Sequence, residues 1–149
     1  MSVAAPHAPV TAHTGRCHCG AIKVEFHSDK PFAPRACGCS FCRKHGAVSI
    51  SDPDGRTIIS YTGQPAPLAY RFGLKTAEFL ICPTCGVYIG AVIDVAGRLY
   101  SVVNLNIFEI SDAAPAATPM SYDAESTEDR IGRRERVWTP TRIEVIGDA

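Results

Sequence analysis

Seven cysteines in three short groups constrain this chain more than any other feature. They form a C-x-C pair, a C-x-C-x-x-C triplet and a C-x-x-C pair, at Cys17 and Cys19, at Cys37, Cys39 and Cys42, and at Cys82 and Cys85. Because seven is an odd number, disulfides alone would leave one thiol unpaired, and two thiols separated by a single residue bridge each other only with strain. A disulfide framework therefore fits this pattern poorly.

Zinc fits the pattern better, because thiolates two or three positions apart on a tight turn can bind one ion at about 2.3 Å in a tetrahedron. The seven then divide as four plus three. The last pair needs two further thiolates, which either the first pair or two members of the triplet can supply. We favour the first pair, since the triplet then provides three ligands and an open fourth position, as in catalytic zinc sites. Two alternatives remain for the triplet: it holds no metal, or Cys39 and Cys42 form a redox-active pair.

Length and charge narrow the class of protein. The chain has 149 residues, of which 46% are hydrophobic, so we expect one compact domain over residues 14–149 after a flexible leader over 1–13. Fifteen basic and fifteen acidic residues cancel, which argues against nucleic acid and anionic membranes as partners. No segment has the roughly 18 apolar residues of a membrane span. The start does not resemble a secretory signal, so we expect a cytoplasmic protein in a reducing compartment.

The hydrophobic pattern predicts a mainly β fold. Residues 21–26 alternate apolar and polar, which indicates a half-buried strand with Ile22, Val24 and Phe26 facing inward. One helical turn is expected at 40–45, and one charged helix at 124–137, capped by Ser121 or Asp123. Further strands are predicted at 47–51, 56–61, 68–72, 78–81, 87–95, 98–103 and 142–146, with hairpin turns at 52–55 and 96–97. The sheet is expected to be antiparallel.

The cysteine motifs resemble those of the glutathione-dependent formaldehyde-activating enzyme family, and the chain looks like a short member of it. The matching motifs are Gly15-x-Cys17-x-Cys19-Gly20, Cys37-x-Cys39-Ser40-x-Cys42-Arg43-Lys44-x-Gly46 and Cys82-Pro83-x-Cys85-Gly86. The resemblance implies tent-like sheets pinned by a structural zinc on Cys17, Cys19, Cys82 and Cys85, and a catalytic zinc on Cys37, Cys39 and Cys42. The implied reaction joins formaldehyde and glutathione into S-hydroxymethylglutathione, which is carbon-sulfur lyase chemistry in reverse. The chain departs from the family at 119–123, where members commonly carry histidine and tryptophan.

The chemistry of a three-thiolate zinc agrees with such a reaction. The site would carry a charge of about −1, and a thiol binding at the fourth position would lose its proton. The nearest candidate to protonate the product is His45, followed by His18, although solvated histidines are the alternative. Arg43 and Lys44 directly follow the triplet, and either attract the carboxylates of glutathione or offset the thiolate charge.

For three other groups of residues, a structural role competes with a role in the site. Phe41 is expected to plug the core rather than to contact substrate. Asn104 and Asn106 either line the cleft or stabilise a turn. The arginines of the predicted charged helix are expected to form a solvated face with ion pairs, and they are Arg130, Arg133, Arg134 and Arg136.

Two functions therefore compete. One is a zinc-dependent enzyme that adds a thiol to a small aldehyde, or catalyses the reverse. The other is a non-enzymatic zinc module that binds a protein or a small ligand. They differ in whether the zinc of the triplet is exchangeable and open to a thiol. The sequence does not indicate an oligomeric state.

Overall fold

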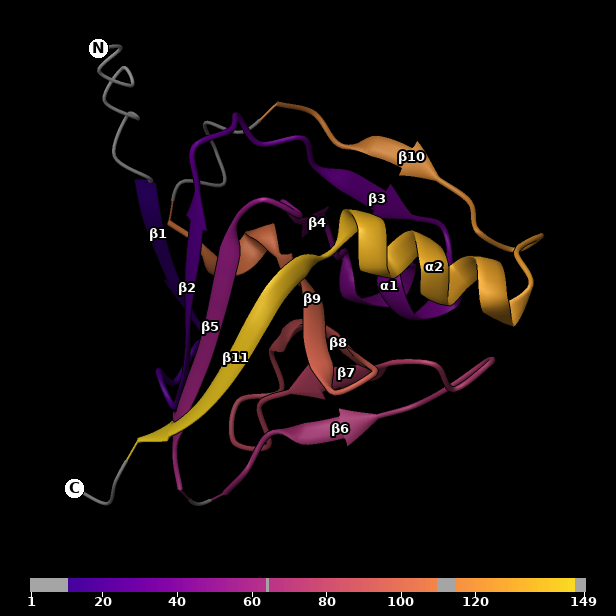
Figure 1. Ribbon diagram of the computed structural model, residues 1–149. Coiled ribbons are helices and arrows are strands. Elements are labelled where there is room, and N and C mark those ends of the chain that lie inside the picture. Colours follow the sequence, from indigo (N-terminus) through magenta and orange to yellow (C-terminus); the bar gives the residue numbers. More distant parts are fainter. Residues whose placement is uncertain (1–10, 64, 110–114, 147–149) are drawn as a thin grey trace, which may run out of the picture.

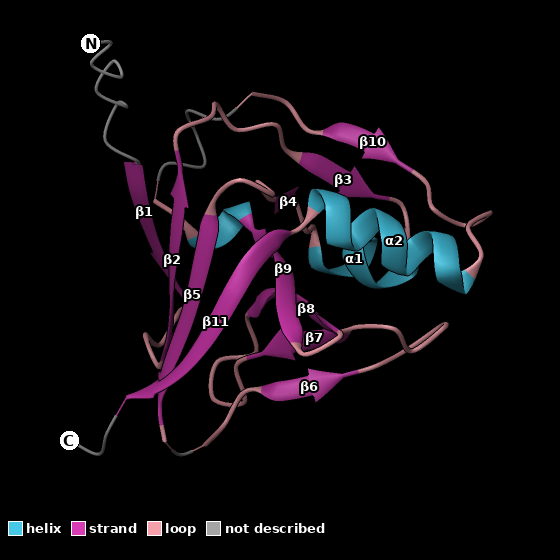
Figure 2. Cartoon of the chain, in the orientation of Figure 1, coloured by secondary structure: helices cyan, strands magenta, loops and turns pink. Residues whose placement is uncertain are grey.

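The computed structural model describes residues 11–63, 65–109 and 115–146, and its elements are drawn in Figures 1 and 2. The helices are α1 (Ser40–His45), the single 3-10 turn η1 (Leu105–Ile107) and α2 (Thr127–Val137). The strands are β1 (Thr11–Arg16), β2 (Ile22–Ser28), β3 (Arg35–Cys37), β4 (Ser49–Ile50), β5 (Arg56–Thr62), β6 (Leu68–Tyr70), β7 (Glu78–Ile81), β8 (Tyr88–Val95), β9 (Arg98–Asn104), β10 (Thr118–Met120) and β11 (Thr139–Ile146). The predicted mainly β fold is confirmed.

Strand β9 joins the parts of a branched sheet. It pairs with β8 from Arg98 to Val103, and also with β11 near its start and with β4 near its end. One arm continues from β11 through β5 and β2 to β1, and these strands lie side by side in Figure 1. The other arm continues from β8 through β7 to β6. The arms diverge from β9, and α2 packs against β8 and β9 at the junction, while α1 lies against β3 (Figure 2).

The pairing is mostly antiparallel, as predicted, but two pairs run parallel. Strand β11 is parallel to β5, and β10 is parallel to β3. Each of these pairs brings together segments that are far apart in the sequence. Because no short turn joins the two strands of either pair, nothing local imposes the antiparallel direction that a hairpin would.

The predicted hairpin at 96–97 is confirmed. Strands β8 and β9 pair in continuous register from Gly90 opposite Val103 to Val95 opposite Arg98. Ala96 and Gly97 both have positive φ, of 53° and 85°, as the two central residues of a tight hairpin turn require.

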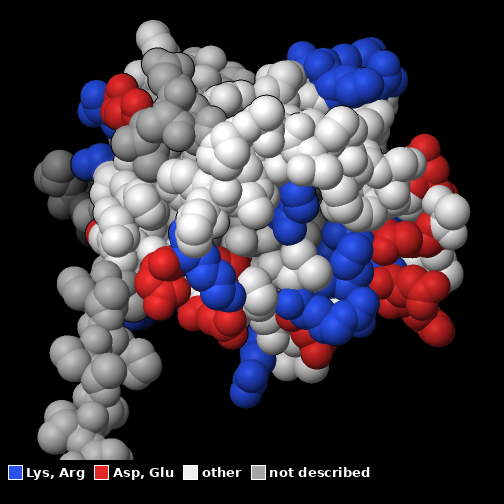
Figure 3. All heavy atoms as spheres, turned by 90° about the horizontal axis from the view of Figure 1, so that it is seen from above, with Lys and Arg blue, Asp and Glu red and all other residues white. Residues whose placement is uncertain are grey.

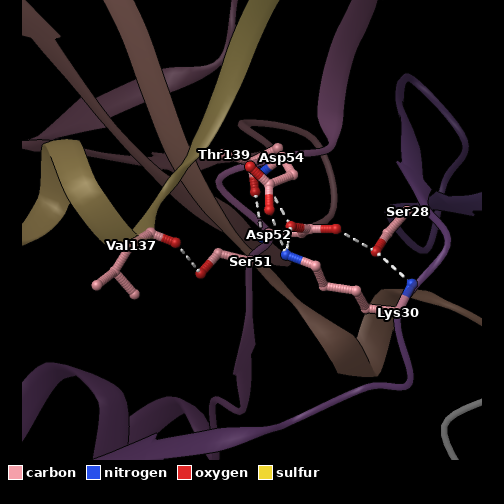
Figure 4. A network of polar contacts seen from close by, with 7 residues as sticks. All are labelled: Ser28, Lys30, Ser51, Asp52, Asp54, Val137 and Thr139. Carbon is pink, nitrogen blue, oxygen red and sulfur yellow. Dashed lines mark hydrogen bonds and ion pairs between the residues drawn. The ribbon is translucent and has the colours of Figure 1, made fainter.

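The predicted hairpin at 52–55 is wrong, although its turn forms. The Gly55 N–H donates to the Asp52 carbonyl at 2.9 Å, but β4 pairs with β3 and β9 while β5 pairs with β2 and β11. Figure 4 shows the reason. The buried Asp52 carboxylate accepts hydrogen bonds from Ser28 Oγ at 2.5 Å and Lys30 Nζ at 2.9 Å, and the Asp52 N–H donates to Thr139 Oγ1 at 2.8 Å. These bonds attach the turn to β2 and β11, so the strands on either side of it separate.

Regular structure is present earlier in the chain than predicted. Strand β1 starts at Thr11 and pairs with β2 over six residues, from Thr11 opposite Ser28 to Arg16 opposite Lys23. Residues 11–13, which were expected to belong to the flexible leader over 1–13, are therefore part of a strand. The rest of that leader, residues 1–10, lies outside the described residues. The assignment of 14–149 to a single domain stays a prediction.

The late helix starts three residues after its predicted start. Helix α2 has Ser126 as its N-cap, with the Ser126 hydroxyl accepting from the Asp129 N–H at 3.1 Å. Of the expected caps, Ser121 instead donates to Asp123 at 3.4 Å. The helix ends at Val137, as predicted. Among the described residues, no helix is long and apolar enough to cross a membrane.

The main core lies under the arm formed by β1, β2 and β5. Ile22, Val24 and Phe26 are each at most 2% exposed, which confirms the inward face predicted for this strand. They pack with Cys17 and Cys82 in the same cluster. The hydrophobic core and the first cysteine group are therefore continuous.

Candidate functional site

Four cysteines from two distant turns meet at one end of the core. Cys17 and Cys19 follow β1, and Cys82 and Cys85 follow β7. The Sγ–Sγ distance is 3.6 Å from Cys17 to Cys19 and also from Cys19 to Cys82, and all four sulfurs lie within 4.8 Å of one another. The edge of a tetrahedron with zinc at its centre would be about 3.8 Å. This geometry favours the pairing of the first and last groups over the alternative that used the triplet.

The two turns have the same local structure. The Cys17 N–H donates to the Ile22 carbonyl and the Cys82 N–H to the Val87 carbonyl, both at 3.0 Å. Gly20 and Gly86 stand at equivalent positions with φ of 83° and 80°, where a side chain would be strained. Each turn thus bends the chain so that its two thiols point to one place.

The second group forms where β3 meets α1. Cys37 ends β3, Cys39 is the N-cap of α1, and Cys42 lies one turn further along the helix. The Cys42 N–H donates to Cys39 Sγ at 3.4 Å, and the three sulfurs lie within 4.8 Å of one another. The helix ends at Gly46, which has φ of 59°. The predicted helical turn therefore directs Cys42 back towards the other two thiols.

The proximity of these thiols makes one of them acidic. A hydrogen bond from Cys42 lowers the pKa of Cys37 to about 5, and the positive charge of Arg133 contributes. The same interaction, together with burial, raises the pKa of Cys42. The three thiols therefore share their protons unequally, and Cys37 is the one most readily deprotonated.

Both groups have the donor chemistry that zinc requires. Their ligands are all cysteine sulfurs, which favour a soft or borderline ion over magnesium or calcium. The first group offers four ligands and can close a tetrahedron by itself. The second offers three and leaves room for another ligand on the side that faces a cleft.

The cleft beside the triplet is mostly apolar. Its empty space, including the part open to solvent, is about 670 Å³. Its lining residues come from both ends of the chain, and they are Arg35, Cys37, Cys39, Cys42, Ser49, Phe72, Phe79, Tyr88, Ala91, Val102, Tyr122, Arg133, Arg134 and Trp138. Any ligand in this cleft would lie next to the three thiols.

Tyr88 is a buried tyrosine in the wall of this cleft. It is only 3% exposed, and burial raises its pKa well above the usual value, with the charges of Cys42, Cys39 and Cys37 adding to the effect. At neutral pH its hydroxyl therefore stays protonated.

Arg133 lines the cleft with its charge already paired. Its Nε and Nη2 donate to the two carboxylate oxygens of Glu125 at 2.8 and 3.0 Å. The guanidinium also lies 3.6 Å from the centre of the Tyr122 ring. These contacts hold Arg133 and Tyr122 together as one wall of the cleft.

Arg134, in contrast, is buried and has no acidic partner among the described residues. It is 8% exposed, its Nη1 donates to Thr76 Oγ1 at 2.6 Å, and its guanidinium lies 4.7 Å from the Trp138 ring. Its Nε is buried and donates to none of the described residues. Burial, together with the charges of Arg133 and Arg130, lowers its pKa to about 10, so Arg134 is still a cation at neutral pH.

The expected solvated arginine face of α2 is therefore only partly correct. Arg136 is exposed, but Arg133 and Arg134 face the cleft. On the face shown in Figure 3, basic and acidic side chains lie next to one another at the edge of a largely uncharged surface. The sequence carried a signal for the buried arginine: Arg134 lies four positions before Trp138 and three after Ile131, on the apolar side of the helix.

The other predicted site residues do not line this cleft. Arg43, Lys44 and His45 lie on the exposed side of α1. The His45 ring packs on Phe41, with the ring centres 4.3 Å apart, and Arg43 Nε donates to the Gly38 carbonyl at 3.0 Å. His18 is exposed beside the four-cysteine group. A role for these residues inside the cleft is not supported by their positions.

Phe41 and the two asparagines have structural roles. Phe41 is 9% exposed and packs against Phe72, Phe79 and Tyr88, as expected for a core plug. The Asn104 side chain caps η1 by accepting from the N–H of residue 106 at 3.1 Å, and its amide donates to the Tyr88 carbonyl. These asparagines stabilise a turn and are not among the residues that line the cleft.

The residues that sequence reasoning missed come from segments far from the cysteines. Tyr88 and Trp138 stand in ordinary strand or helix-end patterns, and Tyr122 lies in an irregular segment. Their approach to the triplet depends on the pairing of β8 with β9 and on the path of α2, and no local pattern reports either of these.

Comparisons with known proteins agree with this geometry. The family model of the glutathione-dependent formaldehyde-activating enzyme matches residues 12–122, which include all seven cysteines. A crystal structure of a Rhodobacter sphaeroides protein is 32% identical and superposes with a TM-score of 0.54, covering 73% of this chain and 99% of its own. With its cysteines in this arrangement and the match over most of its length, the chain belongs to the glutathione-dependent formaldehyde-activating enzyme family.

Proposed function

We propose that this protein is a zinc-dependent enzyme that adds the thiol of glutathione to a small aldehyde such as formaldehyde, or catalyses the reverse carbon-sulfur lyase reaction. The observation that carries the proposal is the position of the triplet. Cys37, Cys39 and Cys42 lie within 4.8 Å of one another and line the same cleft. A purely structural zinc would need a fourth protein ligand and no cleft.

Each part of the site has a role in this reaction. Zinc on the three thiolates supplies Lewis acidity that lowers the pKa of an incoming thiol. The apolar walls around Phe72 and Phe79 exclude bulk water from the carbonyl group. Tyr88 donates a proton to the oxygen as the carbon-sulfur bond forms, in place of the His45 expected from the sequence. Arg43 and Lys44, on the exposed side of α1, attract the carboxylates of glutathione from solution.

The competing function is a zinc module without catalysis. It predicts that the ion at the triplet is shielded from thiols and does not exchange. The cleft next to the triplet supports the enzyme instead, because it gives a small ligand a path to the three sulfurs.

Zinc analysis of the freshly reduced wild type and of Cys39→Ser, each with and without glutathione, tests the proposal. We expect two ions per chain in the wild type and one in the variant, with glutathione changing the exchange rate of the second ion only. Catalysed interconversion of formaldehyde, glutathione and S-hydroxymethylglutathione would then be measured by NMR exchange spectroscopy. One ion in both proteins, unaffected by glutathione, would instead favour the zinc module.

A further inference from the structure

We propose that the carbonyl substrate of this cleft carries a carboxylate next to its aldehyde group, and that Arg134 binds this carboxylate. This inference rests on the proposed function and specifies its substrate. Formaldehyde has no charge and gives an arginine nothing to bind. The cleft nevertheless contains a guanidinium that has no acidic partner among the described residues.

The burial of Arg134 requires compensation that the protein itself provides only in part. A guanidinium removed from water is costly unless anions or several acceptors surround it. Thr76 accepts one hydrogen bond and the Trp138 ring offers its face, but Nε has no partner among the described residues. By contrast, the neighbouring Arg133 donates two hydrogen bonds to the carboxylate of Glu125. Among the described residues, Arg134 is therefore a cation in the wall of the cleft that remains available to a ligand.

The chemistry of the guanidinium selects the kind of ligand. Its planar arrangement of N–H donors matches a carboxylate, which can accept two parallel hydrogen bonds. Arg35 lines the same cleft, and its contact with Ser51 Oγ at 2.6 Å leaves its charge unneutralised by any described carboxylate. The two arginines make the cleft positive, although the protein as a whole has no net charge.

The size of the cleft indicates which substrate carries the carboxylate. The volume that water can reach is about 90 Å³, which equals the volume of about three waters in the liquid. An aldehyde with an adjacent carboxylate has that size, whereas glutathione, a tripeptide, does not. Glutathione then inserts its thiol and leaves its own carboxylates outside.

The reaction with such a substrate balances without a further reactant. The S–H bond of the thiol breaks and a bond forms between sulfur and the aldehyde carbon. The electron pair of the carbonyl π bond moves to oxygen, which takes up one proton. No oxidation or reduction occurs, and the carboxylate stays unchanged throughout.

The two residues of this carboxylate site lie outside the segment that the family model matches. Arg134 and Trp138 lie beyond the residues 12–122 that the family model matches. The cysteines, in contrast, all lie within them.

The test compares the zinc-loaded wild type with Arg134→Gln, which removes the charge but keeps a donor for Thr76. Arg136→Gln is the control, because this neighbouring arginine is exposed on the same helix and lies outside the cleft. Three aldehydes are supplied with glutathione: glyoxylate, the neutral glycolaldehyde of similar size, and formaldehyde. Each aldehyde is also supplied with 2-mercaptoethanol, a thiol without carboxylates. Catalysed rates above the uncatalysed background are measured together with zinc content and melting temperature.

We expect Arg134→Gln to lower kcat/KM for glyoxylate about 10- to 100-fold with either thiol, as befits loss of a charged hydrogen-bond partner. The same variant should change the values for formaldehyde and glycolaldehyde less than about 3-fold. The proposal would be overturned if Arg134→Gln lowered kcat/KM for every aldehyde supplied with glutathione and for none supplied with 2-mercaptoethanol. Arg134 would then bind the carboxylate of glutathione. An equal fall in kcat/KM in every reaction, together with a loss of zinc, would also overturn the proposal. The role of Arg134 would then be to offset the charge of the thiolates.

Direct titration of glyoxylate in a calorimeter, without thiol, separates this inference from the proposed function. Binding to the wild type and to Arg136→Gln that weakens at least 10-fold in Arg134→Gln supports the inference even if no thiol adduct forms with any aldehyde. Equal binding to all three proteins, or no binding to the wild type, overturns it.

Discussion

The two cysteine groups of this protein differ in what they connect. The four-cysteine group joins turns in which Cys19 and Cys82 are 63 residues apart, and two of its members lie in the main core at 1% exposed. The triplet spans only six residues and faces a cleft. A cation that closes a long loop in the core stabilises the fold, whereas one held by a short segment adds little beyond its own ligands. Position in the chain therefore separates a structural site from a functional one.

The largest expected effect comes from breaking the four-cysteine group. Zinc binding to a four-thiolate site contributes about 10–16 kcal/mol, as much as the whole stability of a domain of this size, which is about 5–15 kcal/mol. Cys82→Ser should therefore lose its cooperative unfolding transition, measured by circular dichroism on heating. Cys39→Ser should keep that transition. Equal loss of folding in the two variants would refute the division between the groups.

The Asp52 network should affect stability without affecting either metal site. Asp52→Asn weakens the hydrogen bonds to Ser28 and Lys30 and should lower the free energy of unfolding in urea by about 2 kcal/mol. Zinc content at neutral pH should equal that of the wild type. A variant that loses zinc from the triplet would show that this site depends on global stability.

The pH dependence of the stability of Asp52→Asn sharpens the comparison of the two cysteine groups. Burial by itself would raise the pKa of Asp52, but the hydrogen bonds from Ser28 and Lys30 outweigh it and lower the pKa below 3.8. The contribution of Asp52 to the free energy of unfolding is therefore fully present above the pKa that this carboxyl has in the unfolded chain. It is lost only as the pH falls through the lowered pKa of the folded state. The difference between wild type and Asp52→Asn should stay constant from pH 7 to about pH 5. A loss of stability over that range in both proteins then comes from other groups, with the thiolates as the expected cause.

Tyr88→Phe tests the functional side of the comparison. Removal of a proton donor from the cleft should lower kcat for the thiol addition on the order of 10²-fold. The zinc content should stay at two ions per chain, because Tyr88 is not a ligand of either group. An unchanged kcat would assign proton transfer to solvent or to another residue.

His45→Ala should have the smallest effect. The ring lies on Phe41 outside the cleft, so we expect a loss of about 0.5–1 kcal/mol in stability from the aromatic contact. The rate of thiol addition should change less than about 2-fold. A large fall in rate with unchanged zinc content would restore the catalytic role expected from the sequence.

The sequence predicts the parts of this protein that depend on neighbouring residues. The division of the cysteines, the strand with Ile22, Val24 and Phe26, and the turn at 96–97 follow from spacing and local patterns, and all were found. The strands around 52–55 did not form a hairpin, because Asp52 bonds to side chains that are 24 and 87 residues away. A pattern within a few residues carries no information on such partners.

For the same reason, only some of the residues that line the cleft could be predicted from the sequence. Its thiols are local in sequence, but Tyr88 and Arg134 reach them through strand pairing and helix packing. The position of Arg134 was not predicted, because a charged helix normally presents its arginines to solvent.

Helix α2 also has an evolutionary consequence. It supplies one wall of the cleft from a segment that the family model does not cover, while the residues that can hold metal all come from the matched part. Substitutions in this helix would thus change the wall of the cleft without touching a residue that can hold metal. Relatives with identical metal sites should then be sorted by the residues at the positions of Arg134 and Trp138, rather than by their cysteines.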